Sequence, residues 1–93
     1  MALVQTNAKV LTTPTLVCTI PSGVQYTTVS LYNGSADSIF IGGASVTTTG
    51  ATRGQIIATE GTAVLCLNAG DSLYAIAASD TNAGDLAIIY SGI

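Results

Sequence analysis

The sequence contains no histidine and no tryptophan. Histidine is the commonest general base and metal ligand near neutral pH, so neither a Ser-His-Asp nor a Cys-His catalytic arrangement can form. No apolar run approaches the ~20 residues of a membrane-spanning helix. The N-terminal stretch MALVQTNAKV also lacks the basic start and long apolar segment of a secretion signal. We therefore expect a protein that is made in the cytoplasm, does not enter a membrane and is not an enzyme.

Charged residues are scarce: they make up 8% of the 93 residues, whereas an ordinary soluble domain has about 25%. Lys9 and Arg53 are the only cations, too few to bind the phosphates of a nucleic acid. The anions are Asp37, Glu60, Asp71, Asp80 and Asp85. With a net charge of only −3, copies of the protein repel one another weakly. We infer that subunit contacts cover part of the apolar surface.

Carboxylates are the remaining candidates for catalysis or metal binding. Asp71, Asp80 and Asp85 lie beside turn residues, where aspartates usually accept hydrogen bonds from their own backbone. A glycosidase needs two carboxylates facing one cleft, and a dedicated calcium loop needs regularly spaced acids. Because the sequence has neither pattern, we expect no catalytic residue, no metal and no cofactor, with a calcium site on the turn aspartates as the weaker alternative.

The two cysteines, Cys18 and Cys66, are too few for a disulfide-stapled scaffold. In a reducing compartment, free cysteines usually pack as small buried hydrophobic residues. We therefore predict two buried thiols, with a disulfide between two packed sheets as the alternative.

Strand signals recur along the whole chain, whereas helix signals are almost absent. The segments that favour strands are residues 16–20, 26–32, 38–41, 55–59, 63–67, 73–77 and 86–90. In YTTVSLY, residues 26–32, alternation predicts that Val29 and Leu31 face inward. Asn33-Gly34 is a strong turn signal, so we predict a hairpin that joins residues 26–32 to residues 38–41. Short strands separated by glycine-rich turns predict an all-β antiparallel sandwich or small barrel of about seven or eight strands.

Residues 1–15 differ from the rest, because they end in Thr-Thr-Pro-Thr, which favours an extended chain. They are predicted to form either an edge strand or an arm that lies on a neighbouring molecule. Residues 16–93 are predicted to form one sandwich domain, since the chain is long enough for one domain and not for two.

Two kinds of function fit these properties. A structural assembly module would form a stable oligomer on a larger particle. A binding module would have a preformed cleft, and the four tyrosines, Tyr26, Tyr32, Tyr74 and Tyr90, could stack on a sugar there. Tyrosines more often lie at a packed surface with the hydroxyl in water, so we favour the assembly module.

The run VSLYNGSADSIFIGGASVTTTG, together with LNAGDSLYAIA further along the chain, resembles small virion proteins of tailed bacteriophages. The corresponding positions run from Asn33 to Gly50 and from Leu67 to Ala77, and the departures from the pattern are Ala36 and Phe40. The resemblance implies an all-β protein, often trimeric, without a catalytic residue.

Related modules occur as head decoration proteins and as parts of tails, fibres and spikes. A free-standing chain of 93 residues fits head decoration better, so the expectation is a homotrimer on the virion that binds the major capsid protein and stabilises the head. The alternative is a tail, fibre or spike component that contacts a host-cell glycan or receptor. The candidate capsid contacts are Val46, Thr47, Thr48, Thr49 and Arg53. Small hydroxylated side chains suit a contact because they lose little entropy and bond without the desolvation cost of a charge.

Overall fold

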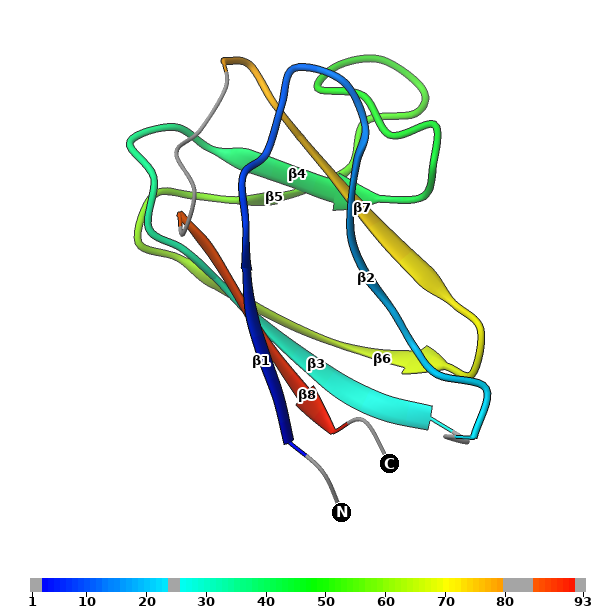
Figure 1. Ribbon diagram of the computed structural model, residues 1–93. Helices are drawn as coiled ribbons and strands as arrows, with labels where there is room; N and C mark the ends of the chain where they lie inside the picture. Colours follow the sequence, from blue (N-terminus) through cyan, green and yellow to red (C-terminus); the bar gives the residue numbers. More distant parts are fainter. Residues whose placement is uncertain (1–2, 24–25, 80–84, 92–93) are drawn as a thin grey trace.

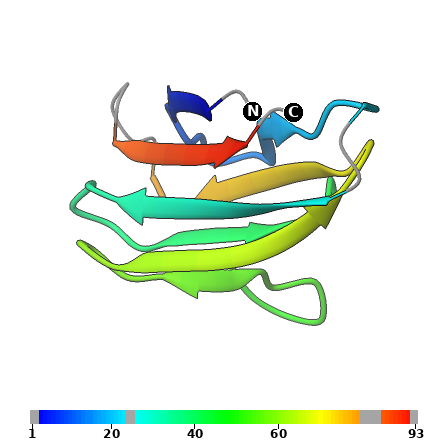
Figure 2. The same ribbon diagram turned by 90° about the horizontal axis from the view of Figure 1, so that it is seen from below.

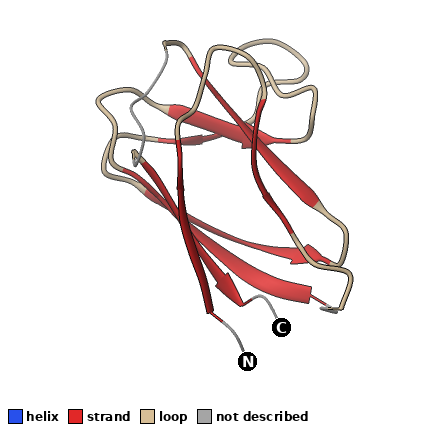
Figure 3. Cartoon of the chain, viewed as in Figure 1, coloured by secondary structure: helices blue, strands red, loops and turns tan. Residues whose placement is uncertain are grey.

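The computed structural model describes residues 3–23, 26–79 and 85–91, which form eight β-strands and no helix (Figures 1 and 3). The strands are β1 (Leu3–Ala8), β2 (Thr15–Thr19), β3 (Tyr26–Asn33), β4 (Ile39–Gly42), β5 (Gln55–Ile57), β6 (Thr62–Asn68), β7 (Ser72–Ala77) and β8 (Leu86–Ser91). The predicted all-β sandwich is confirmed.

The strands form two antiparallel sheets of four strands each, which we call sheet A (β1-β8-β3-β6) and sheet B (β2-β7-β4-β5). The first strand pairs with the eighth, the second with the seventh, the third with the sixth and the fourth with the fifth. This nested pairing is that of one long hairpin rolled up on itself, the eight-stranded jelly roll. In Figure 2 the two sheets have their strands in the same order from top to bottom, so β6 and β5 lie on one side of the sandwich and β1 and β2 on the other.

The core lies between the sheets and follows the period of two that strands impose on side chains. In β3, Val29 and Leu31 are buried as predicted, whereas Tyr26 and Tyr32 are exposed. In β4, Ile39 and Ile41 face the core and Phe40 lies on the opposite face. Each sheet therefore has one apolar face against the core and one outer face.

The hairpin predicted for residues 26–32 and 38–41 is wrong. β3 pairs with β6 and β8 in sheet A, whereas β4 pairs with β5 and β7 in sheet B. Asn33 does not sit in a tight turn but ends β3, with its side chain fully buried. Its amide nitrogen donates to the carbonyl oxygens of Asp37 and Ile57, each at 2.8 Å. Its amide oxygen accepts bonds from the backbone N–H and the hydroxyl of Ser35, at 2.9 and 2.7 Å. These bonds hold the connection that carries the chain from one sheet to the other.

The N-terminal segment takes the form of an edge strand in its described part. β1 is antiparallel to β8 at the edge of sheet A. Val10 then enters the core, and the carbonyl oxygen of Leu11 accepts a hydrogen bond from Ala77 N at 3.0 Å. These contacts integrate the segment with both sheets.

The two cysteines lie in different environments, which corrects the prediction that both are buried. Cys18 in β2 is 7% exposed and belongs to the core. Cys66 in β6 is exposed on the outer face of sheet A. Both thiols are free, so the structure does not contain the disulfide between the sheets that was the alternative. The apolar run AVLCL shows no alternation, so the sequence could not indicate which of its residues face outward.

This difference predicts unequal thiol reactivity. Burial raises the pKa of the Cys18 thiol, and this effect outweighs a backbone hydrogen bond at Leu73 that lowers it. Because the thiolate is the reactive form, we expect a maleimide at pH 8 to label Cys66 at least ~100-fold faster than Cys18. Intact mass measurement over time checks this. A Cys66→Ser variant should take up label only after denaturation, and rapid labelling of that folded variant would contradict the burial of Cys18.

The same shift makes a pH prediction. The unfolded chain releases the Cys18 proton near the ordinary thiol pKa, about 8.5, whereas the folded chain holds the proton to higher pH. The stabilising contribution of the neutral thiol is therefore complete below that pH and is lost as the pH rises further. Denaturant titrations of the protein and of a Cys18→Ala variant should differ in their alkaline slope, with the shallower decline in the variant.

Candidate functional site

The charges of the described residues all lie in loops, and no charged residue lies in any of the eight described strands. The loop charges are Lys9, Asp37, Arg53, Glu60, Asp71 and Asp85, and Asp80 falls outside the described residues. Asp71 caps its own turn as predicted, because its carboxylate accepts a 2.8 Å bond from Asn68 N. Since neither outer sheet face carries a charge, each face can contact another protein without the cost of removing water from a charged group.

The outer face of sheet A carries several exposed apolar and aromatic side chains. The exposed fraction is 70% for Leu3, 66% for Tyr26, 65% for Val64, 42% for Tyr32 and 38% for Ile89. A shallow groove of about 190 Å³ runs over β1, β8 and β3, lined in part by Tyr32 and Ile89. This face is a candidate contact surface, since apolar surface rimmed by polar groups often marks one.

The outer face of sheet B has a second apolar row. The strand register places Ile76, Phe40 and Ile56 side by side across β7, β4 and β5. Leu16 lies opposite Tyr74 on the neighbouring pair of strands. Ile56 and Leu16 are more than half exposed, whereas Ile76 is almost covered by its surroundings. The sandwich therefore presents uncharged surface on both of its broad sides.

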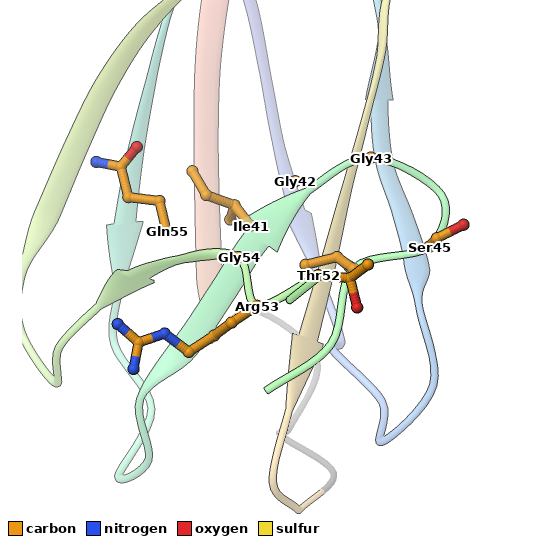
Figure 4. Close-up of a pocket in the computed structure, with 9 residues that line it drawn as sticks. Ile41, Gly42, Gly43, Ser45, Thr52, Arg53, Gly54 and Gln55 are labelled. Atoms are coloured by element: carbon orange, nitrogen blue, oxygen red, sulfur yellow. The ribbon is translucent and has the colours of Figure 1, made fainter. Parts of the chain in front are cut away.

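The predicted contact residues lie in the long loop between β4 and β5, residues 43–54. Beside them is a hollow of about 330 Å³, and Arg53 is the one charged residue among those that line it. Figure 4 shows the Arg53 side chain extending away from Ser45. The guanidinium of Arg53 therefore lies at a hollow whose other lining residues are uncharged and include three glycines.

Val46 differs from the other predicted contacts because its side chain is buried. It packs between two backbone segments: its side chain would meet a Cβ added to Gly42 at 3.1 Å and one added to Gly54 at 2.5 Å. Val46 therefore anchors the loop to the sandwich and is not available to a partner. This corrects its assignment as a contact residue.

The remaining predicted residues form a loop with internal hydrogen bonds. The Thr47 hydroxyl donates to the Thr49 carbonyl oxygen at 2.7 Å and lies 2.8 Å from the Thr52 hydroxyl. The backbone of Thr47 bonds to Thr52 and Gly54 at 3.1 and 3.0 Å. Thr49 and Arg53 are exposed at the surface of this loop. The loop is thus shaped in advance, which lowers the entropy cost of a contact made there.

The four tyrosines do not form a common platform. Tyr26 and Tyr32 lie at opposite ends of the outer face of β3, and Tyr74 lies on the outer face of the other sheet. Tyr90 packs against the core. A sugar could therefore meet only one or two of these rings at a time.

The described residues contain no group of three or more His, Cys, Asp or Glu side chains that could hold a metal ion. These residues also form no helix that could span a membrane. The hollow beside Arg53 is lined by no carboxylate. The site's chemistry is that of hydrogen bonding and one guanidinium charge.

No protein-family model matches the chain, and no curated protein matches it. A solved structure from Bacillus endospore appendages, described as a novel family of disulfide-linked pili, is similar to the chain with a TM-score of 0.56 and 17% sequence identity. The similarity covers 97% of this chain and 84% of the other. At this identity, the likeness shows a shared fold alone.

Proposed function

We propose that this protein is a non-enzymatic structural protein that attaches to the outer surface of a tailed-bacteriophage head and stabilises it through contacts with the major capsid protein. The single observation that carries an assembly role is the placement of charge: the strands have none, and both outer faces expose apolar side chains. The resemblance of residues 33–50 and 67–77 to phage virion proteins favours the phage particle as the assembly that the protein joins. The fold is also that of a protein from an assembled appendage.

The loop between β4 and β5 is the proposed capsid contact, with Thr47, Thr48, Thr49 and Arg53 as its residues. Its threonines can exchange hydrogen bonds with a partner backbone without the desolvation cost of a charge. Arg53 adds one guanidinium, which can bind a carboxylate through two parallel hydrogen bonds. Each copy needs to contribute only a modest free energy, because the contact is repeated over the shell.

Binding to purified mature heads, emptied of DNA and stripped of the protein, tests the proposal. We expect saturable binding with a fixed number of copies per shell, and a higher temperature of shell disruption when the protein is bound. An Arg53→Gln variant should bind roughly tenfold more weakly, because a charge at the rim of an interface is lost. Lys9→Gln, which removes the other cation, is the matched control and should bind as the unaltered protein does.

The absence of saturable binding to shells would refute the proposal. The exposed rings of Tyr26 and Tyr32 favour one other candidate, a tail, fibre or spike component that contacts a host glycan. Binding to host cells or to a glycan array, abolished by Tyr26→Ala or Tyr32→Ala and unaffected by Arg53→Gln, would support that candidate instead.

A further inference from the structure

β6 is an edge strand with an unusual composition for its position. It pairs with β3 on one side, and it is the longest of the four edge strands. Its run AVLCL, residues 63–67, is apolar at every position, a pattern typical of strands that are buried on both faces. In the single chain, Val64 is 65% exposed, Cys66 is exposed, and Leu65 and Leu67 are only half-buried. The strand therefore has the sequence of an interior strand at the edge of a sheet.

The other three edges have features that discourage pairing with another chain. β2 has a bulge between Leu16 and Cys18, and prolines 14 and 21 flank it. β5 has only 3 residues. β1 carries polar side chains at its outward positions Gln5 and Asn7. β6 has no bulge and no flanking proline, and the polar side chains on its outer face, Thr62 and Asn68, stand only at its two ends.

The backbone of β6 offers free hydrogen-bonding groups at defined residues. Asn33 N donates to the Gly61 carbonyl oxygen at 3.0 Å, in register with the β3–β6 pairs. In an antiparallel ladder, bonded and non-bonded pairs alternate. The N–H and C=O groups of residues 63, 65 and 67 therefore point to β3, whereas those of Thr62, Val64 and Cys66 point to the open edge. Asn68 also points outward, but its N–H is already bonded to the Asp71 carboxylate.

We propose that β6 pairs antiparallel with β6 of a second copy, about a two-fold axis that passes Val64, so that two sheets A join into one continuous sheet. In this register Val64 faces Val64 of the second copy, and Thr62 faces Cys66. The outward N–H and C=O groups of Thr62, Val64 and Cys66 are then all satisfied, and the capped Asn68 lies outside the ladder. On the inner face, Ala63 faces Leu65, a small side chain against a large one.

A second copy fits this edge for reasons of charge and symmetry. The strand has no charge, and the two-fold arrangement uses the same edge twice, as isologous interfaces do. The nearest anions, Glu60 and Asp71, do not face each other in this register, because Glu60 lies opposite Asn68 and Asp71 lies beyond the end of the partner strand. A two-fold contact also keeps both exposed Val64 side chains on one face, where β-branched pairs across strands are favourable.

Sedimentation of the full chain in solution, without any particle, tests the pairing. We expect an even-numbered assembly: a dimer, or a hexamer if the trimer implied by the phage resemblance forms through another surface. A Val64→Pro variant should weaken the two-fold contact by at least ~100-fold, because proline removes the outward N–H and is tolerated at a free edge. Val64→Thr, which keeps the N–H and the branched shape, is the matched control and should leave the assembly intact.

The register is tested separately by disulfide trapping in a Cys66→Ser background. Val64→Cys should give a crosslinked dimer in nearly full yield under mild oxidation, since directly opposed residues have a Cα separation that allows a disulfide. Thr28→Cys lies on the same outer face one strand inward and should give none. If the Val64→Pro variant fails to fold, Val64→Lys provides a second test. It places a charge at the edge without changing the backbone, and it should also dissociate the two copies.

A monomer or an isolated trimer for the unaltered protein would overturn the pairing. Equal dissociation of Val64→Thr and Val64→Pro would also overturn it, because apolar contact and not strand pairing would then hold the copies together. The pairing does not depend on the proposed phage role: failure to bind shells leaves the sedimentation result unchanged, and a monomer that still binds shells would remove the pairing alone.

Discussion

An Asn33→Asp variant should melt about 15–25 °C below the unaltered protein, which corresponds to a loss of roughly 3–5 kcal/mol for a domain of this size. The substitution keeps the size of the side chain and removes its two donors. The carbonyl oxygens of Asp37 and Ile57 would lose their 2.8 Å bonds and face a buried carboxylate. Because these bonds join β3 to the connection with sheet B, the loss should affect both sheets. Thermal unfolding followed by circular dichroism measures it.

The Asn33→Asp variant should also show a pH dependence of defined sign. Burial disfavours the charged carboxylate, so the new carboxyl should take up a proton more readily than an exposed one, and its O–H can replace one lost donor. The difference in melting temperature should therefore shrink as the pH falls. Asn7→Asp, on the exposed outer face of β1, is the matched control and should change the melting temperature by only a few degrees. A similar loss of melting temperature in both variants would show that Asn33 has no special role in the connection between the two sheets.

A Gly54→Ala variant should lose about 2–4 kcal/mol of stability and disturb the proposed contact loop. A Cβ at this position would overlap the Ile41 carbonyl oxygen and would lie 2.5 Å from the Val46 side chain, closer than atoms can approach. Because Ile41 is part of β4 and cannot yield, the loop must move instead. We expect a melting temperature lower by about 10–20 °C. Shell binding should fall at temperatures where the variant is still folded.

Gly43→Ala is the control for the same loop. An added Cβ there would meet no atom within 4 Å, so the substitution should be neutral or slightly stabilising. Equal effects of the two substitutions would show that Gly54 is needed for its flexibility and not for the close approach of β4 and Val46.

Strand positions could be predicted from the sequence because they depend on local alternation. The alternation around Val29 and Leu31 predicts that both face the core, and both are buried. The hairpin prediction failed because Asn33-Gly34 has the residues of a tight turn, whereas Asn33 holds the connection between the two sheets through its side-chain hydrogen bonds. The Asn33 side chain donates a hydrogen bond to β5, where Ile57 supplies one of its acceptors from a distant part of the chain. No local pattern contains that contact.

The same limit applies to the candidate site. Thr49 and Arg53 could be predicted as exposed loop residues, because a run of small polar residues after a glycine turn seldom folds inward. Val46 belongs to that run, but its fit against Gly42 and Gly54 depends on how the loop returns to β5. The exposure of Cys66 depends on which strand occupies the edge of sheet A.

The amino-acid sequence alone predicts that the chain forms strands, excludes histidine-based catalysis and shows that little charge is available for any surface. These properties follow from composition and from the period of two along each strand. The pairing of the strands, the strand that lies open at an edge and the location of the few charges become visible only in the folded protein. Those features arise from contacts between residues far apart in the chain, and their free energy depends on the packing of two sheets at once.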